Sequence, residues 1–578
     1  MSKTINWLFV VITSNRHTVT VITAMFIGVI SAMAIIVFRS MTEIIRDGVF
    51  IHGQRLLHIG TDLSSRALLP VLPIIGAIML IPFSMRFPGE VCGYGLPGFL
   101  ENVNLKGGVI KLRTVFLKMI ATSITIGTGG SAGVEGPSAI IGGGIGSLVG
   151  QWLGLSKRRL RLLIASGAAG AIAAIFNAPI AGVMFATEII MLGNYEMESF
   201  GAVVISAGMA TAVSQAYYGS HPTFIVASHN IIGVKEIPFY LLFGLLIGVI
   251  AVIYIKVFYG IKDFFADINL PQQVKAIAGA FCIGLIGIFL PQVMGDGYAS
   301  ITEALNGHYS LTFFVVLIFF KIFATSITLG SGGAGGVFAP SLFIGAMTGG
   351  AFESAVHKLF PHMTSNPGAY ATVGIGAFLA AATHAPLTGI FLLIEMTGDY
   401  KVIIPVMFAS ITGLFVSKAL LKDSIDTFEL SRRGVDLFMG KEMSILQAIK
   451  VKDIMRKDFT TVNEHEPINT VSDMIINGDG LCFPVVRDSG EIAGIISMHD
   501  VKAVMLEEYI KTVVTAGQLA TEDVVLLNNL DNMKTALERF SINDQDEIPV
   551  VDFLNHKKIV GMLNRSDMIA AYIRAVMQ

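Results

Sequence analysis

The sequence KMIATSITIGTGGSAGVEGP at Lys118–Pro137 is repeated 203 residues later as KIFATSITLGSGGAGGVFAP at Lys321–Pro340, with twelve of the twenty positions identical. Two further matches occur at nearly the same offset and in the same order. They pair Gly93-Tyr94-Gly95 with Gly295-Asp296-Gly297, and Asn177-Ala-Pro with His384-Ala-Pro. The sequence therefore predicts two homologous halves, at about 18–217 and 235–420.

These halves lie in a chain that is too apolar for an ordinary soluble protein. Of its 578 residues, 53 % are hydrophobic and 14 % are charged, against about 25 % charged in soluble proteins. Five charge-free stretches are predicted to cross a bilayer, and five shorter apolar segments are interrupted by glycine or proline. The stretches are 18–38, 67–85, 237–255, 276–295 and 402–417, and the interrupted segments are 95–103, 134–150, 177–190, 336–350 and 385–398. We predict a multi-pass α-helical membrane domain at 1–440.

Broken helices at corresponding places in two halves predict a transport site at the middle of the bilayer. A helix start carries unpaired N–H groups and about half a positive charge, so several starts aimed at one point can hold an anion. The segments Gly93–Pro97, Gly133–Pro137 and Gly336–Pro340 share a Gly–x–x–x–Pro pattern that suits such starts.

Two other interpretations of the glycines are weaker. A nucleotide-binding loop is disfavoured because the chain has no GxxxxGK[ST] sequence. Close packing of helices by small residues accounts for Gly142, Gly146 and Gly150, which recur every four residues. It does not account for the repeated Gly–x–x–x–Pro pattern.

Glu135 is the one carboxylate in these three turns. An ionisable group at membrane depth is a functional candidate, because burying it there is costly. As a carboxylate it resembles an anion and can occupy the anion's site, and when protonated or displaced it leaves that site. Its repeat mate is Phe338, so the turn itself needs no acid. Glu188 and Glu395 are mates of each other, which favours a capping or hydrogen-bonding role.

The last part of the chain has a different composition. Residues 451–578 carry a net charge of −8, whereas 1–450 carry +6. After a charged connector at 418–450, two similar units follow at about 451–508 and 516–575. Each unit has a β run, a turn, a second strand and a helix. We predict a soluble α/β domain at 441–578, and its acidic charge gives no basis for a nucleic-acid partner.

Several classes of site are not expected. Cys92, Cys282 and Cys482 are widely spaced, which predicts neither a disulfide framework nor a zinc site. No nucleophile–base arrangement points to an enzyme. The N-terminal segment lacks a small-residue cleavage site, so we expect it to be retained.

The motifs GYGLP, GVEGP and GVFAP resemble, in that order, the GSGIP, GREGP and GxFxP motifs of the CLC family of chloride channels and proton/chloride exchangers. The resemblance covers about 15–435. It implies an inverted repeat of broken helices, a homodimer in the plasma membrane, one anion pathway per subunit and Glu135 as the gate. The implied anion-binding positions are Tyr94, Gly133, Val134, Glu135, Gly136, Val337 and Phe338.

The chain departs from the family pattern at three positions. The family's central-site serine is replaced by Tyr94, whose hydroxyl can supply a donor, and its central-site tyrosine is replaced by Asp426. An ionised Asp426 would repel an anion, so we expect it to turn to the cytosol, with protonation as the alternative. Ile189 stands where many exchangers carry a proton-transfer glutamate, which resembles the channels. Asp426 and Glu188 are the candidates for a substitute proton path.

The two C-terminal units resemble a cytosolic pair of CBS domains. In that family a Ser/Thr–x–x–Asp sequence can hold an adenosine ribose. Ser497 and Asp500 match it, and Asn564 and Asp567 match it less well. The resemblance implies no required cofactor and a site for an adenosine nucleotide, with a purely structural regulatory pair as the alternative.

The sequence supports three functional hypotheses. The favoured one is a chloride-conducting protein gated by Glu135, channel-like or weakly proton-coupled, because Ile189 cannot carry a proton. The alternatives are an obligatory proton/chloride antiporter and a membrane-bound nucleotide sensor. The expected partners are chloride and other small anions, protons, the lipid bilayer and a second copy of the chain.

Overall fold

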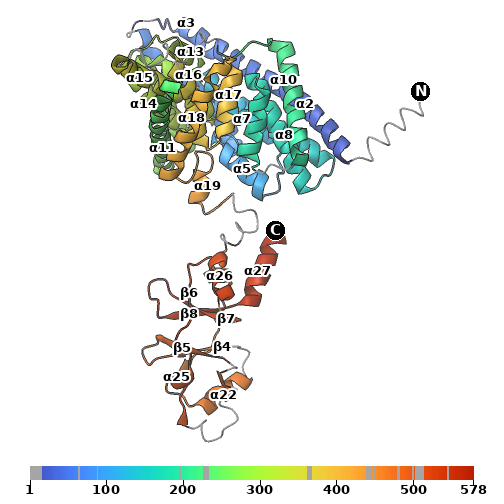
Figure 1. Cartoon of the computed structure of the whole chain (residues 1–578), viewed down its shortest axis with the longest axis vertical. Coiled ribbons are helices and arrows are strands. Elements are labelled where there is room, and N and C mark those ends of the chain that lie inside the picture. Colours follow the sequence, from blue (N-terminus) through green and yellow to red (C-terminus); the bar gives the residue numbers. More distant parts are fainter. Residues whose placement is uncertain are drawn as a thin grey trace, which may run out of the picture. The chain divides into compact units, whose positions relative to one another are not determined.

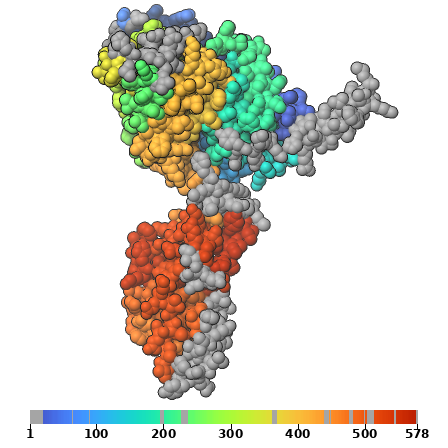
Figure 2. Space-filling model, in the orientation of Figure 1, coloured from blue at the N-terminus to red at the C-terminus, as the bar shows by residue number. Residues whose placement is uncertain are grey.

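The computed structural model describes residues 16–60, 62, 65–87, 89–193, 197–224, 234–360, 368–437, 446, 449–477, 482–497, 500–501, 513–542 and 546–577. The chain divides into two compact units, Met1–Leu430 and Ser431–Gln578. The helices of the first are drawn in blue to orange, and the second is orange to red (Figure 1; Figure 2). The boundary predicted at 440/441 lies outside the described residues.

The first unit is helical and follows the predicted repeat. Its first half comprises α2 (Arg16–Ile45), α4 (Val71–Arg86), α5 (Leu96–Leu105), α6 (Leu112–Gly127), α7 (Glu135–Trp152), α8 (Lys157–Phe176), α9 (Pro179–Phe185) and α10 (Met197–Tyr218). Its second half comprises α11 (Ile237–Asp267), α12 (Gln272–Phe289), α13 (Tyr298–Leu305), α14 (Leu311–Ser331), α15 (Phe338–Leu359), α16 (Ala369–Thr383), α17 (Pro386–Thr397) and α18 (Ile403–Leu420). The sequence matches fall on corresponding pairs of helices, from α6 with α14 to α9 with α17.

Eight helices in the described part of the chain are long and apolar enough to cross a membrane. Four of them match the predicted stretches at 18–38, 67–85, 237–255 and 402–417. A fifth matches 276–295 only in part, because this helix ends at Phe289, just before Pro291. The other three are Lys157–Phe176, Phe200–Tyr218 and Leu311–Ser331. The first begins with charged residues, the second is rich in Ala and Gly, and the third contains Lys321 at its centre. The charges interrupt a charge-free stretch in the first and third helices, whereas the small residues lower the hydropathy of the second.

The interrupted segments are helices whose breaks have identifiable causes. Helix α8 is followed by Asn177 and α16 by His384, and both of these capping residues have left-handed backbone with φ of 58°. Each is followed by Ala-Pro, and the proline starts the next helix, α9 or α17. A left-handed residue ends a helix, and proline is tolerated in a first turn, so the repeated tripeptide produces the same break in both halves.

Paired glycines bring the central helices into close contact. A Cβ on Gly142 of α7 would overlap the carbonyl oxygen of Gly167 on α8, and a Cβ on Gly167 would overlap the oxygen of Gly142. The second half repeats this contact between Gly345 of α15 and Gly374 of α16. Small residues let helix backbones approach closely, which confirms the packing role predicted for the glycines of α7.

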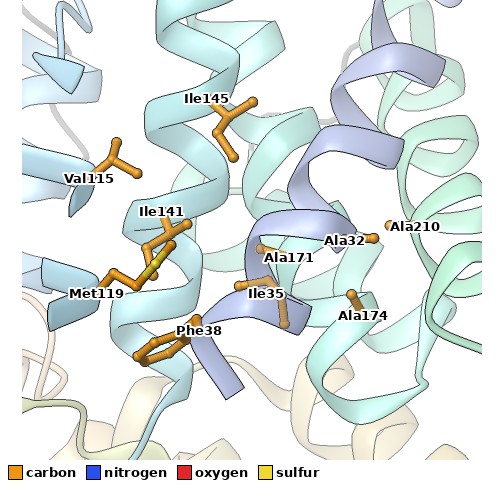
Figure 3. Close-up of a cluster of buried hydrophobic side chains, with 10 residues drawn as sticks. All are labelled: Ala32, Ile35, Phe38, Val115, Met119, Ile141, Ile145, Ala171, Ala174 and Ala210. Atoms are coloured by element: carbon orange, nitrogen blue, oxygen red, sulfur yellow. The ribbon is translucent and has the colours of Figure 1, made fainter. Parts of the chain in front are cut away.

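Apolar packing around these helices holds the first half together. A buried cluster joins α2, α6, α7, α8 and α10 (Figure 3). Phe38 of α2 packs beside Met119 of α6 and Ile141 of α7, while Ala171, Ala174 and Ala210 line the α8 and α10 side. Val134, the residue directly before α7 and Glu135, also packs against this cluster.

Short backbone pairings join the two halves at the helix starts. Strand β1 (Gly93–Tyr94) pairs in parallel with β2 (Ala334–Gly335). Gly133 and Gly336 exchange two N–H···O bonds of 2.8 and 2.7 Å. The three Gly–x–x–x–Pro segments are therefore held together.

The second unit contains two copies of one motif, as predicted, although the helix predicted after the second strand of the first copy lies mostly outside the described residues. The first has β3 (Val462–Asn463), α22 (Ile468–Asn477), β4 (Cys482–Val486) and β5 (Ile492–Ser497). The second has β6 (Leu527–Asn528), α26 (Met533–Ile542), β7 (Glu547–Val551), β8 (Ile559–Asn564) and α27 (Arg565–Met577). In each three-stranded sheet the central strand pairs in parallel with the first strand and antiparallel with the last.

Candidate anion pathway

Three helix starts converge where the halves meet. Helix α5 starts at Leu96, α7 at Glu135 and α15 at Phe338, and the pairings of β1 with β2 and of Gly133 with Gly336 hold these starts together. The first N–H groups of a helix lack intrahelical partners and carry partial positive charge. The junction is therefore lined by backbone amides and is suited to binding an anion.

The carboxylate of Glu135 occupies this place. The residue is fully buried, and its Oε2 accepts a 3.2 Å hydrogen bond from the N–H of Ala339 in the first turn of α15. Oε2 also lies directly against Gly133, where a Cβ would overlap it. Glu135 thus uses a helix-start amide of the opposite half, as an external anion would.

A tyrosine that the sequence analysis did not single out completes the contacts of Glu135. Tyr298, the first residue of α13, donates its hydroxyl to Glu135 Oε1 at 2.7 Å. The corresponding residue in the first half is Leu96. The repeat is therefore not conserved at Tyr298, just as it is not conserved at Glu135, whose counterpart is Phe338. That asymmetry is the sequence signal that could have identified it.

A second phenol–carboxylate pair lies near the same junction. Tyr94 donates its hydroxyl to Asp426, and both side chains are buried. The Tyr94 ring comes within 3.6 Å of the position that a Cβ on Gly136 would take. Asp426 Oδ2 has no hydrogen-bond partner within the described ranges. The Tyr94 hydroxyl is therefore directed at Asp426.

The expectation that Asp426 turns to the cytosol is wrong. The turn that carries it is docked on the helical body: the N–H of Ile425 donates to Ala382 O at 2.9 Å, and the Tyr259 hydroxyl donates to Ile425 O at 2.7 Å. This docking leaves Asp426 facing Tyr94, with 1 % of its surface exposed.

Two buried lysines hold the loops that precede these helix starts. Lys118 Nζ donates to Val91 O and Gly93 O at 3.4 Å each. Its repeat mate Lys321 donates to Val293 O and Gly295 O at 3.0 Å each. The two contacts are related by the repeat, so these cations belong to the scaffold of both halves.

Glu188 and Glu395 cap helices of opposite halves. Glu188 accepts from the N–H groups of Leu387 and Thr388, at 3.0 and 2.7 Å, in the first turn of α17. Glu395 accepts from Ile180 and Ala181, at 3.0 and 2.7 Å, in the first turn of α9. The two carboxylates therefore make reciprocal caps.

The remaining predicted positions lie on the same junction. Val134 and Val337 are the residues before α7 and α15, and Phe338 packs its ring 5.5 Å from that of Phe185 on α9. Ile189 is buried next to the capping Glu188. An apolar side chain at Ile189 offers no group that could exchange a proton.

The candidate nucleotide residues form local contacts in the second unit. Asp500 Oδ2 accepts from both the N–H and the hydroxyl of Ser497, at 2.8 and 2.7 Å. Asp567 instead pairs with Arg456 at 2.8 Å. The two proposed half-sites are therefore different, and only the first has the Ser–Asp arrangement.

A buried glutamate links the two motifs of this unit. Glu547 Oε1 accepts from Asn564 Nδ2 at 3.0 Å, and Oε2 accepts from the N–H of Cys482 at 3.3 Å. Burial, and then the charges of Glu547 and Asp500, raise the pKa of the Cys482 thiol to about 12.

Family models match both units. The model described as voltage gated chloride channel matches residues 74–418, and the CBS domain model matches residues 451–507 and 516–574. These matches cover the converging helix starts and both β/α motifs.

Named relatives are chloride channels and exchangers. A protein of Ralstonia nicotianae, whose name places it with ClcB-like chloride channels, is 30 % identical over 71 % of this chain and 96 % of its own length. The H(+)/Cl(-) exchange transporter ClcA of Vibrio campbellii is 34 % identical over 61 % of this chain and 77 % of its own length.

Solved structures share the architecture. A slow cyanobacterial Cl-/H+ antiporter superposes with a TM-score of 0.64 at 26 % identity, covering 72 % of this chain and 97 % of that one. A eukaryotic CLC transporter covers 95 % of this chain and 97 % of its own, with a TM-score of 0.63 at 18 % identity, which shows the fold alone.

Proposed function

The chain belongs to the voltage-gated chloride channel family and carries a CBS pair, and from this premise we propose that it moves chloride across a membrane along a path gated by Glu135. The observation that carries the proposal is the Glu135 carboxylate bound to a helix-start amide of the other half.

The gate works because the Glu135 carboxylate and a chloride ion compete for the same binding site. An ionised Glu135 takes the helix-start N–H of Ala339 and excludes a chloride ion that would use the same amides. Protonation removes the negative charge, weakens this contact and lets the side chain leave. Chloride then binds to the amides at Gly133–Gly136, Val337 and Phe338, with no full positive charge required.

The test is Glu135→Gln in liposomes loaded with chloride. We expect faster chloride efflux at neutral pH and loss of most of its pH dependence, because glutamine is uncharged at every pH. Glu303→Gln is the matched control, since Glu303 is an exposed glutamate of α13 that pairs with His308. Efflux and pH dependence that are equal in the Glu135→Gln and wild-type proteins would refute the gate.

We propose channel-like or weakly coupled flux, because Ile189 is apolar and Glu188 already accepts three hydrogen bonds from Leu387 and Thr388. Obligatory proton/chloride exchange is the second candidate. The buried position of Asp426 favours it, since an interior carboxyl on this path offers a proton-binding group that Ile189 lacks.

One experiment separates the two candidates. Chloride is held at equilibrium across the liposome and only a proton gradient is applied. Channel-like flux predicts little net chloride movement. Strong proton-driven chloride uptake would establish exchange, and its loss in Asp426→Asn would then identify the proton carrier.

For the second unit we propose a cytosolic regulatory role with adenosine nucleotide at Ser497 and Asp500. The support is the pair of hydrogen bonds from Ser497 to Asp500, which positions one carboxylate oxygen near the end of β5. We propose no required cofactor. We further propose that the protein is a homodimer in the plasma membrane, which light scattering of the detergent-solubilised protein tests.

A further inference from the structure

We propose that Tyr298 is the latch of the gate: its phenol holds the ionised Glu135 in the anion's place and sets the pH at which the path opens. This inference rests on the proposed function and extends it to a residue outside the Gly–x–x–x–Pro turns. The two side chains are 163 positions apart in the sequence and meet only in the folded chain.

The geometry assigns each oxygen of Glu135 a different partner. Oε2 faces the amide of Ala339 at 3.2 Å, while Oε1 faces the hydroxyl of Tyr298 at 2.7 Å. The amide contact imitates what an anion would make. The phenol contact is specific to the side chain, so it can be removed without altering the amide-lined place itself.

Tyr298 is positioned by its own surroundings. It starts α13 directly after Gly297, which has left-handed backbone with φ of 87°, and its N–H donates to Asp296 Oδ1 at 3.2 Å. Its ring packs 5.7 Å from that of Phe224. The hydroxyl is thus held toward Glu135 by a turn, a hydrogen bond and an aromatic contact.

Charged groups also face this pair. Asp296 lies in the turn before α13, Lys321 comes from α14 and Arg39 comes from α2. Lys321 is committed to the carbonyls of Val293 and Gly295. Within the described residues, Tyr298 is the side chain that donates a hydrogen bond to Glu135.

The direction of the effect follows from the chemistry of the bond. A neutral phenol donates more strongly to a carboxylate than to a carboxylic acid, so it stabilises the ionised, closed form. Tyr298→Phe removes the donor and keeps the ring. The closed form is then less stable, and the gate opens at a higher pH.

The experiment measures chloride efflux from liposomes against pH for wild type, Tyr298→Phe, Glu135→Gln and the double variant. Tyr298→Phe should shift the pH of half-maximal efflux upward by about one unit, the size expected for one hydrogen bond to a charged group. Tyr309→Phe is the control, because its ring packs on Phe313 and Phe314 instead.

The double variant keeps the inference falsifiable. If Tyr298 acts through Glu135, the double variant should match Glu135→Gln in rate and pH profile, and that match also shows that the path is intact. An unshifted Tyr298→Phe profile, or additive effects in the double variant, would overturn the latch. If Glu135→Gln itself changes nothing, the gate fails, and the latch fails with it.

Discussion

Glu188 and Glu395 are carboxylates that the repeat preserves, and each one satisfies the start of a helix in the other half. A carboxylate that accepts several N–H bonds at a helix start is favoured both by hydrogen bonding and by the helix dipole. Positions that obey the repeat, including Lys118 and Lys321, build the scaffold. Positions that break it, such as Glu135 and Tyr298, face the proposed path.

This division predicts the behaviour of Glu188 variants. Glu188→Ala leaves the N–H groups of Leu387 and Thr388 unpaired, which costs about 1–3 kcal/mol, so the melting temperature of the solubilised protein should fall. Glu395→Ala, the matched change, should lower it similarly. Glu188→Gln should leave any proton-driven chloride uptake intact per folded molecule, and a selective loss of that uptake would instead make Glu188 a proton carrier.

Glu135 was predictable from the sequence as the candidate gate, whereas the contact between Tyr94 and Asp426 was not. Glu135 is evident because a charged residue interrupts a repeated glycine turn whose mate is Phe338. Asp426 and Tyr94 meet across 332 positions, and no local pattern reports on such a contact. Burial of Asp426 depends on how its turn docks on Ala382 and Tyr259, which is a tertiary event.

At the scale of elements, the helices are arranged by glycine contacts that leave no room for a side chain. Gly142 and Gly167 in the first half, and Gly345 and Gly374 in the second, bring backbone against backbone. The four-residue glycine spacing predicted a packed face on α7. The partner helix could not be predicted, because Gly167 stands in an alanine-rich helix with no comparable pattern.

Gly167→Ala should therefore destabilise the first unit strongly. The new Cβ would overlap the carbonyl oxygen of Gly142, and overpacking a well-packed site costs typically about 1–3 kcal/mol. Gly208→Ala on α10 is the control, since nothing lies within 4 Å of its Cβ position. Thermal unfolding followed by size-exclusion chromatography should show a lower transition for Gly167→Ala, and an unchanged one would contradict the packing.

At the scale of the whole molecule, the chain combines two units of opposite charge and different chemistry. The composition change identified both, and the internal repeat of each predicted its motifs. The sequence could not place a boundary sharply, because the connector carries neither the apolar periodicity of the first unit nor the strands of the second.

The second unit should fold without the first. Residues 445–578 expressed alone should be soluble, unfold cooperatively and form a dimer or larger assembly. Cys482 is the only cysteine in this segment and serves as a reporter. With a thiol pKa raised to about 12, it should resist a maleimide at pH 7.5 until the unit unfolds. Rapid labelling under native conditions would contradict this protection of the thiol.

Nucleotide binding has its own readout in the same segment. Adenosine nucleotide should raise the melting temperature, because a ligand that binds only the folded form stabilises it. Asp500→Ala should reduce this shift more than Asp567→Ala, since Asp567 is engaged by Arg456. Equal shifts in both variants would contradict a site at Ser497 and Asp500.

The reciprocal caps also set the order in which the two halves can complete their contacts during synthesis of the chain. The first turn of α9 emerges from the ribosome with the N–H groups of Ile180 and Ala181, yet the carboxylate that they bind belongs to Glu395, 214 residues after Ala181. At about 5–20 residues per second, translation of that interval takes roughly 10–40 s. Until Glu395 has been synthesised the first turn of α9 lacks this cap, so the contact can form only after nearly all of the second half has been made.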